Sequence, residues 1–473
     1  MPPEVKELHL SETYNFSVLV KSMDQTFAAD LHICPEIVTL RIMGETDTAR
    51  KFELDSWKID ELRCFSLRDS FVLVGLSFLK GGWRSVGPNK RNYFENTYEV
   101  QELFHVHSGN GIASNTKISK INLHSPSVAQ WLGYTRLQHK VIDHYHDGTL
   151  RAQPYGFNVE LSCKTDEDAA LVISYDIHEG YSLSSFQSQM TFLPTAGAEF
   201  ISTRDLSTLP HTIADLLAIF SFVCGGPLAL DRIAFQPAAV FGTTGSYYRK
   251  GLGRNAEHGY RPILISFNTF SAPELETTAV SWEKIFHSYF RLAEDLRNLF
   301  HKYLTYRALD SIEERFLGFF RLLEKLTFQK ATFVDPNQLA MLLKRVKPFL
   351  IRRFGNKDGV ASLIRGISRL NESKYNTEKC VATLFHRLPQ EMTSNWKLTT
   401  KELASVCKLR NDMVHANNHQ VSEDELLSMM VFVELLLTAA LAEQISIPAG
   451  ESKNYLPQHQ QYSHIAKHYG TKS

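Results

Sequence analysis

The chain lacks the features that mark several common classes of protein. Its 473 residues include only six cysteines, and no two of them form a Cys-x-x-Cys pair. Scattered single thiols suit a reducing compartment and argue against both a disulfide framework and a zinc ribbon. We therefore expect a cytoplasmic protein that holds no metal and no other cofactor.

An excess of charge of one sign is also missing. Lys+Arg and Asp+Glu both number 51, which gives a net charge of zero at pH 7. Net charge therefore points to no polyanionic partner, and a surface for nucleic acid must come from local clustering.

Neither a signal peptide nor a long apolar run is evident. The first ten residues do not have the basic-then-apolar order of a signal peptide. The longest apolar runs, 71–79 and 429–441, are too short to span a membrane or are interrupted by Glu434. We expect no membrane partner.

Residues 1–275 are predicted to form a β-rich domain. Short runs rich in β-branched and aromatic residues, separated by glycine-containing turns, lie at 37–42, 71–79, 157–163 and 171–177. With no long helix between them, they predict a sandwich or a barrel. One helix is expected from Pro210 to the breaker at Gly225, followed by strand-like runs at 233–235 and 263–267.

Residues 280–448 are predicted to form an all-helical bundle. A polar stretch at 271–281 is the expected linker, and a first helix runs from Trp282 to about Tyr306. A second helix begins at a capping box made by Asp310 and Glu313. Residues 449–473 are expected to be a flexible polar tail. The whole is an α+β multidomain protein.

Two helices near the end of this domain meet at Arg-Asn-Asp-Met-Val-His, residues 410–415. Capping boxes at Thr399 and Ser422 predict where the two helices begin. Arg410 falls on the apolar stripe of the first helix, so it should point inward and needs a carboxylate partner. We considered three candidates for that partner, Glu324, Glu313 and Glu314.

Arg410, Asn411 and His415 suit the cleavage of RNA by its own 2′-OH. That reaction needs a base, an acid and a cation against the phosphoryl oxygens. Histidine titrates near neutral pH, and arginine binds phosphate through two parallel hydrogen bonds. An asparagine amide could orient either group.

A purely structural interpretation of these residues also exists, namely a histidine that stabilises a helix C-terminus and an arginine in a salt bridge. The spacing alone does not decide, because Arg204 and His211 repeat it in a predicted loop. The inward position of Arg410 in a bundle favours a functional site at 410–415.

The motif at 410–415 resembles the Arg-x(4–6)-His motif of HEPN domains. Residues 314–326 and the apolar helix after the motif resemble the Apea-like HEPN branch. The β-rich half, with its helix at 213–222, resembles the N-terminal domain of ApeA-type proteins.

This resemblance implies a metal-independent endoribonuclease of bacterial anti-phage or abortive-infection defence. It implies a homodimer in which Arg410 and His415 of two protomers face each other as catalytic residues, with Asn411 in the accompanying polar position. It suggests a structured RNA such as tRNA as substrate, and a phage product sensed by the N-terminal domain as trigger.

A basic segment precedes the motif, and between residues 344 and 374 nine cations face only two acids. It is either a phosphate-binding strip or a solvated helix face. The residues predicted to bind RNA are Lys344, Arg345, Lys347, Arg352, Arg353, Arg365 and Arg369.

Histidines cluster at 105–107 and at 139–146, but no third group with ligand spacing accompanies them. We interpret them as surface or loop residues, and those of the tail at 459, 464 and 468 as incidental. Gly251-Leu252-Gly253 is expected to be a surface turn and not a phosphate loop.

The alternative to a nuclease is a module without catalytic activity. It would bind nucleic acid or a nucleotide, or serve only to dimerise, in a defence or toxin–antitoxin system.

Overall fold

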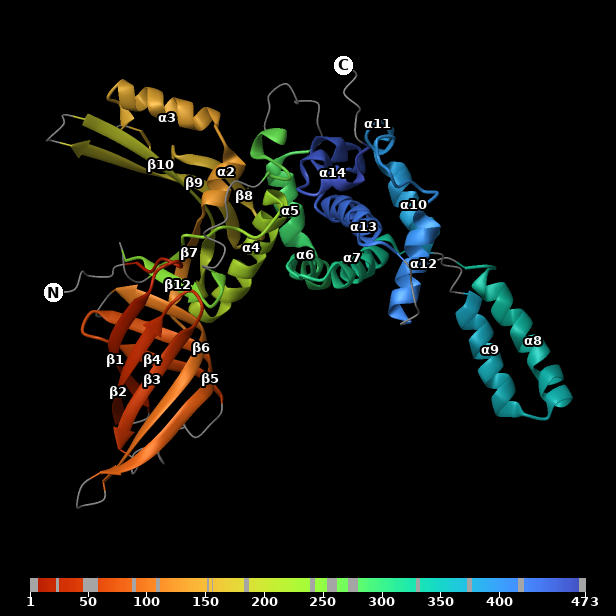
Figure 1. Ribbon diagram of the computed structural model, residues 1–473, viewed down its shortest axis with the longest axis horizontal. Helices are drawn as coiled ribbons and strands as arrows, with labels where there is room; N and C mark the ends of the chain where they lie inside the picture. Colours follow the sequence, from red (N-terminus) through yellow and green to blue (C-terminus); the bar gives the residue numbers. More distant parts are fainter. Residues whose placement is uncertain are drawn as a thin grey trace. The chain divides into compact units, whose positions relative to one another are not determined.

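The structure is a computed structural model of the full chain. It describes residues 7–22, 25–45, 58–86, 91–107, 111–150, 153–154, 156–182, 187–238, 243–252, 262–270, 280–328, 332–371, 377–415 and 421–467. The chain divides into two compact units, Met1–Arg297 and Asn298–Ser473, and each is described by itself (Figure 1). The expected linker at 271–281 falls mostly outside the described residues.

The N-terminal unit is built on one antiparallel sheet of twelve strands (Figure 1). The strands are β1 (Tyr14–Ser22), β2 (Gln25–Ile33), β3 (Val38–Glu45), β4 (Lys58–Phe65), β5 (Asp69–Val86), β6 (Arg91–His107), β7 (Lys117–His124), β8 (Val159–Lys164), β9 (Ala169–Ser182), β10 (Gln187–Asp205), β11 (Arg232–Pro237) and β12 (Gly245–Arg249). Their order in the sheet is β3-β2-β1-β4-β5-β6-β12-β11-β7-β10-β9-β8. Because β3 also pairs with β6, the first six strands close on themselves as a barrel. The predicted fold class is confirmed.

Period-2 patterning explains why these segments form a barrel. In β2 the buried residues Phe27, Ala29, Leu31 and Ile33 alternate with more exposed ones. Successive side chains of a strand point to opposite faces, so one face fills the barrel interior and the other meets solvent.

The helices of the N-terminal unit are α2 (Pro126–Leu132), α3 (Arg136–His146), α4 (Leu209–Cys224) and α5 (Trp282–Arg291). Helix α4 was predicted, and it ends at Gly225, which takes the left-handed conformation with φ 78°. Helices α2 and α3 were not predicted. Their start signals are local, a Ser125 cap and a Thr135–Gln138 capping box.

Two expectations near the end of this unit are wrong. Residues 263–267 do not form a strand; a 3₁₀ helix occupies Phe267–Thr269 instead. The helix expected from Trp282 to Tyr306 is two helices, because Leu292 is extended with ψ 142°. Helix α5 groups with the N-terminal unit, since Trp282 packs against Trp131 with ring centroids 4.9 Å apart.

The C-terminal unit is helical. Its helices are α6 (Glu294–Arg307, which crosses the division), α7 (Ile312–Thr327), α8 (Pro336–Phe354), α9 (Lys357–Asn371), α10 (Thr377–Arg387), α11 (Gln390–Thr393), α12 (Leu403–Val414), α13 (Glu423–Gln444) and α14 (Tyr462–Ile465). Helix α13 is the central element and packs against α7, α10 and α14. Helix α7 begins at a Ser311 cap, one residue after the capping box that we predicted.

Two segments, Leu206–Cys224 and Glu423–Gln444, are long and apolar enough to cross a membrane by length and composition. Their most apolar windows are 56% and 83% buried inside the protein, and core helices of soluble proteins pass the same test.

A buried carboxylate lies at the centre of the helical unit. Glu434 on α13 is fully buried. It lies 3.3 Å from Nε of Arg307, 3.8 Å from Nη2 of Arg315 and 3.3 Å from Nε2 of His459. The Tyr303 hydroxyl donates to it at 3.3 Å. These contacts join α6, α7, α13 and the segment after residue 448.

The prediction of a flexible tail is wrong for residues 449–467. Two 3₁₀ helices, Ala449–Asn454 and Leu456–Gln458, precede α14. Tyr455 and Ile465 are fully buried, and His459 is buried against Glu434, so His459 is not incidental. His468 lies outside the described residues.

Acid should weaken the bundle through Glu434. Burial pushes the pKa of Glu434 up, but His459, Arg307 and Arg315 together bring it below its ordinary value. A carboxylate with a lowered folded pKa contributes stability above its unfolded pKa of about 4.3 and loses it as pH falls through the folded value. The free energy of unfolding, measured with urea, should therefore fall more steeply with decreasing pH for the wild type than for Glu434→Gln.

The size of this contribution can be measured at neutral pH. Glu434→Ala removes the carboxylate that two buried guanidinium groups contact and should lower the free energy of unfolding by about 3–5 kcal/mol. The control Glu391→Ala removes an exposed pair with Lys453 and should lower the free energy of unfolding far less. Equal losses for the two variants would contradict a central role for Glu434.

Candidate active site

Arg410 lies on α12, and its guanidinium group is paired as the sequence led us to expect. Its Nη2 donates to Oε2 of Glu324 on α7 at 2.6 Å, and its Nη1 donates to Oδ1 of Asn411 at 2.9 Å. The guanidinium carbon lies 5.7 Å from the centre of the Phe320 ring, within cation–π range. Glu324, one of the three partners considered, is the one that the structure places there.

Glu324 joins three helices at this point. Its second oxygen, Oε1, accepts a hydrogen bond from the Thr377 hydroxyl at the start of α10, at 3.0 Å. The side chains of Arg410 and Glu324 are 26% and 23% exposed, so the ion pair is partly desolvated but reachable. A pair in this setting fixes the orientation of a planar guanidinium group better than an exposed one.

Arg410 keeps hydrogen-bonding capacity for a ligand. A guanidinium group has five N–H donors, and two of the nitrogens are used by Glu324 and Asn411. The buried Nε finds no hydrogen-bond partner among the residues that the structure describes. The remaining donors match the oxygens of a phosphate group.

His415 ends α12 and is exposed. Its backbone N–H donates to the Asn411 carbonyl at 3.0 Å, and its φ of −93° closes the helix. Within the described part of the chain, no side-chain hydrogen bond joins His415 to Arg410. One chain therefore presents an oriented arginine and, one turn further along, a solvent-accessible imidazole.

The start of α12 differs from the prediction. The Glu402 carboxylate accepts the Thr399 N–H at 2.7 Å, which is half of a capping box, but the Thr399 hydroxyl also donates to that carboxylate at 2.7 Å. The Thr399 hydroxyl oxygen accepts the Lys401 N–H at 3.3 Å, and the Glu402 N–H donates to the Thr399 carbonyl instead. The capping box is therefore incomplete, and α12 begins at Leu403. Ser422 does cap α13, by accepting the Glu425 N–H at 3.3 Å.

Three residues beside Arg410 were not identified from the sequence. Thr377 gives no signal by type or spacing, and Phe320 is indistinguishable from its apolar neighbours. Cys407 lies one turn before Arg410, and burial, with Glu378 and Glu324, raises the pKa of its thiol to about 11. A thiol that stays protonated at neutral pH is not a nucleophile.

The predicted RNA-binding residues all lie on the hairpin formed by α8 and α9. All are exposed except the half-buried Lys347, and within the described residues none is paired with a carboxylate. The hairpin follows α7, which carries Glu324, and leads back to Thr377 on α10. In the chain, the hairpin therefore connects two residues, Glu324 and Thr377, that contact each other beside Arg410.

The other motifs do not form a second site. Arg204 lies on β10 and pairs with Asp166 at 2.8 Å, whereas His211 lies on α4. His139, His144 and His146 lie on α3 and are half-buried or exposed, as expected of surface residues. No group of three or more His, Cys, Asp or Glu side chains among the described residues could hold a metal ion.

His105 is the exception to the surface interpretation of the histidines. It lies on β6, is fully buried, and shares one Asp69 oxygen with His107 at 3.0 and 2.9 Å. Burial alone would raise the pKa of Asp69, but bonds from His105, His107 and Ser66 lower it to about 2. A sheet histidine next to a turn aspartate gives no clear signal in the sequence.

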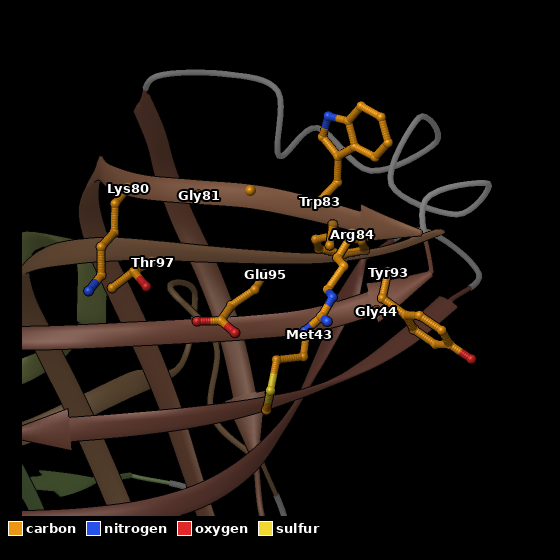
Figure 2. Close-up of a pocket in the computed structure, with 11 residues that line it drawn as sticks. Met43, Gly44, Lys80, Gly81, Trp83, Arg84, Tyr93, Glu95 and Thr97 are labelled. Carbon is orange, nitrogen blue, oxygen red and sulfur yellow. The ribbon is translucent and has the colours of Figure 1, made fainter. Parts of the chain in front are cut away.

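The N-terminal unit has several clefts large enough for small molecules, and two of them combine charged side chains with aromatic or apolar ones. One, of about 690 Å³, lies along β5 and β6, where Figure 2 shows Lys80, Arg84 and Tyr93 directed to the same side of the strands. The other, of about 740 Å³, is lined by His124 and Asp231 among others. Burial lowers the pKa of His124.

Comparison with known proteins identifies one family. Residues 307–451, which contain Glu324, Arg410, Asn411 and His415, match the family described as Apea-like HEPN. Searches of curated proteins and of solved structures found no match. HEPN domains are usually ribonucleases or nucleotide-binding modules. Residues 307–451 therefore match an Apea-like HEPN domain and follow a β-rich N-terminal region, an order of domains consistent with that of ApeA-type proteins.

Proposed function

We propose that the protein is a metal-independent endoribonuclease of bacterial anti-phage defence, acting in the cytoplasm by abortive infection. The observation that carries the proposal is Arg410, held by Glu324 at 2.6 Å with donors to spare, five residues before an exposed histidine. These residues lie within the segment that matches the HEPN family.

The reaction is an attack of the 2′-OH on the adjacent phosphorus. The 2′-O–P bond forms and the P–O5′ bond breaks, so the products carry a 2′,3′-cyclic phosphate and a 5′-OH. One imidazole takes the 2′-OH proton, and a proton is delivered to the leaving 5′-oxygen. The Arg410 guanidinium stabilises the charge that gathers on the phosphoryl oxygens.

A second copy completes the site in this proposal. Within one chain the His415 ring does not reach Arg410 by a hydrogen bond among the described residues, so each chain supplies half of the donors and acceptors. Asn411, whose Oδ1 accepts from Arg410, has its amide N–H groups left for substrate or for the imidazole of the other copy.

The hairpin of α8 and α9 would hold the RNA. Its exposed cations are the residues that a polyanion needs, and in the chain the hairpin lies between Glu324 and Thr377. A substrate that lies along the hairpin extends well beyond the scissile bond, which favours a structured RNA such as tRNA over a short fragment.

The N-terminal unit would sense a phage product and raise the rate of cleavage above the basal rate of the free protein. The two clefts described above are the places where a ligand could act, and their polar side chains allow specific hydrogen bonds.

Removal of the histidine should abolish cleavage. Total RNA incubated with the purified protein and EDTA should give 5′-OH ends, and His415→Ala should lower the rate at least about 100-fold. His464→Ala, which alters an exposed histidine of the same unit, should leave the rate unchanged. Cleavage that needs added metal, or that survives in His415→Ala, would refute the proposal, whereas RNA binding without cleavage would favour the binding module.

Glu324 should act by positioning Arg410. Glu324→Gln keeps the size of the side chain but loses the ion pair, so kcat should fall about 10- to 100-fold with a smaller change in KM. Glu391→Gln is the matched control on an exposed pair. An unchanged kcat in Glu324→Gln, with the fold intact by circular dichroism, would remove Glu324 from the site.

The hairpin cations should appear in the salt dependence of RNA binding. Arg365→Gln and Arg369→Gln together should lower affinity for tRNA and reduce the slope of log K against log [salt] by about 1 to 2. Lys401→Gln, an exposed cation outside the hairpin, should change neither quantity. An unchanged slope in the hairpin variants would show that Arg365 and Arg369 do not contact the phosphates of the RNA.

A further inference from the structure

The hairpin of α8 and α9, called the arm below (residues 336–371), carries more apolar surface than its own packing uses. Figure 1 shows the two helices side by side, and the other helices of the unit do not cover them. The bond from the Phe333 N–H to the Asn371 carbonyl and the bonds between Val334 and the Asn371 side chain close its base.

One set of residues, apolar except for Asn371, joins the two helices to each other. On α8 they recur with the alternating spacing of four and three residues that defines the seam of a helical pair. The α9 residues have the same spacing, and all of these positions are buried or half-buried. The seam positions are Leu339, Leu343, Val346 and Leu350 on α8, and Val360, Ile364, Ile367 and Asn371 on α9.

A second apolar stripe lies beside the seam and is exposed. Leu342 and Phe349 are seven residues apart on α8, and their side chains are 57% and 65% exposed. Leu363 and Leu370 are seven apart on α9, at 51% and 65%. Each stripe residue directly precedes a seam residue. In a heptad whose seam residues occupy positions a and d, the stripe residues therefore occupy position g.

The α8 residues and the α9 residues of this exposed stripe lie on the same side of the arm. In two antiparallel helices the g positions face each other across the seam, because the helices have the same hand and opposite directions. The turn at residues 355–356 sets Leu342 roughly level with Leu370, and Phe349 with Leu363. The four side chains therefore form one flat apolar patch.

This pattern is that of a larger bundle. A pair of helices that packs only on itself needs apolar residues at a and d, whereas apolar residues at a, d and g belong to helices that face a bundle core. The arm has the a, d and g pattern but supplies only two helices. To bury the patch in a bundle core, two more helices would have to pack against it.

Four cations of the arm lie away from the patch, whereas Arg345, Arg352 and Arg353 flank it at about 40–60° around α8. By helical spacing, Lys344, Lys347, Arg365 and Arg369 fall about 100° or more around their helices from the stripe. The α9 edge of the patch is flanked by Gly359 and Gly366, without charge. An anionic partner such as RNA or a lipid surface would bind the cationic sides, and the patch calls for an apolar partner.

We propose that the patch binds the same patch of a second copy, so that two arms form a four-helix bundle. This arrangement is self-complementary, as a twofold axis requires. An axis parallel to the helices sets α8 of one copy over α9 of the other. The arginines that flank the stripe on α8, Arg345, Arg352 and Arg353, then lie opposite the uncharged edge of α9.

The pairing specifies how two copies of the proposed nuclease would associate. Its effect on cleavage rests on the proposed function. With the axis parallel to the helices, both arms have their bases at the same end. Each base is rooted at the Glu324–Thr377 contact beside Arg410. Arm pairing thus brings two Arg410–His415 sets to one end of the bundle and leaves the cationic sides free for RNA.

Sedimentation equilibrium of the full chain at 0.1 and 0.5 M NaCl tests the pairing. The wild type should dimerise, and higher salt should not weaken the dimer, because the flanking charges have like sign. Phe349→Gln combined with Leu363→Gln should weaken dimerisation at least about 100-fold, because four apolar side chains per dimer leave the interface. Met341→Gln alters an equally exposed apolar residue on another side of α8 and should have no effect.

A monomeric wild type, a dimer that salt dissolves, or a dimer unaffected by the double variant would overturn the arm pairing. Cleavage of RNA by the same samples separates this failure from that of the proposed function. A dimeric, active double variant refutes the arm pairing alone. A monomeric double variant that cleaves at the wild-type rate upholds the pairing and refutes the shared active site.

Discussion

The helical unit depends on one buried charge. Glu434 lies in the middle of an apolar helix with no exposure, and a carboxylate there is tolerated only because Arg307, Arg315 and His459 surround it. Removing the carboxylate would leave these partners without their shared counter-charge in a medium of low dielectric constant. The contacts therefore fix how α6, α7 and the segment after residue 448 lie against α13.

The same constraint positions the candidate active site. Arg315 and Glu324 are nine residues apart on α7, which places them on opposite faces of that helix. Arg315 is drawn to Glu434 in the core, so Glu324 faces α12 and meets Arg410. Thr377 adds α10 to the contact, and the arm emerges between Glu324 and Thr377. Core, active site and arm are thus connected through one helix.

Much of the fold could be predicted because its signals are local. Alternating apolar residues predicted the strands, the glycine at 225 predicted the end of α4, and the apolar stripe of α12 predicted that Arg410 points inward. Helices α2 and α3 were missed because they are short, although α3 begins at a complete Thr135–Gln138 capping box. The tail was misjudged because His459 is polar in the sequence, and only its distant partner Glu434 makes it a core residue.

The candidate site shows the same division. Residue type and inward position predicted a carboxylate for Arg410, but three acids remained equal until the rotation of α7 was known. Contacts between distant segments, such as Thr377 with Glu324, leave no trace in spacing. In the arm, the run of cations drew attention to nucleic acid, while the apolar stripe at 342, 349, 363 and 370 became visible only with the exposure of each side chain.

The central claim is that Arg410 and His415 of two chains together cleave RNA. Mixing Arg410→Ala with His415→Ala, each inactive alone, tests it most directly. In a mixed dimer one shared site keeps both an intact arginine and an intact histidine. Since half of the dimers are mixed and each has one such site, the account predicts recovery to about a quarter of the wild-type rate, with 2′,3′-cyclic phosphate ends. A mixture that stays inactive while its chains form dimers would contradict it.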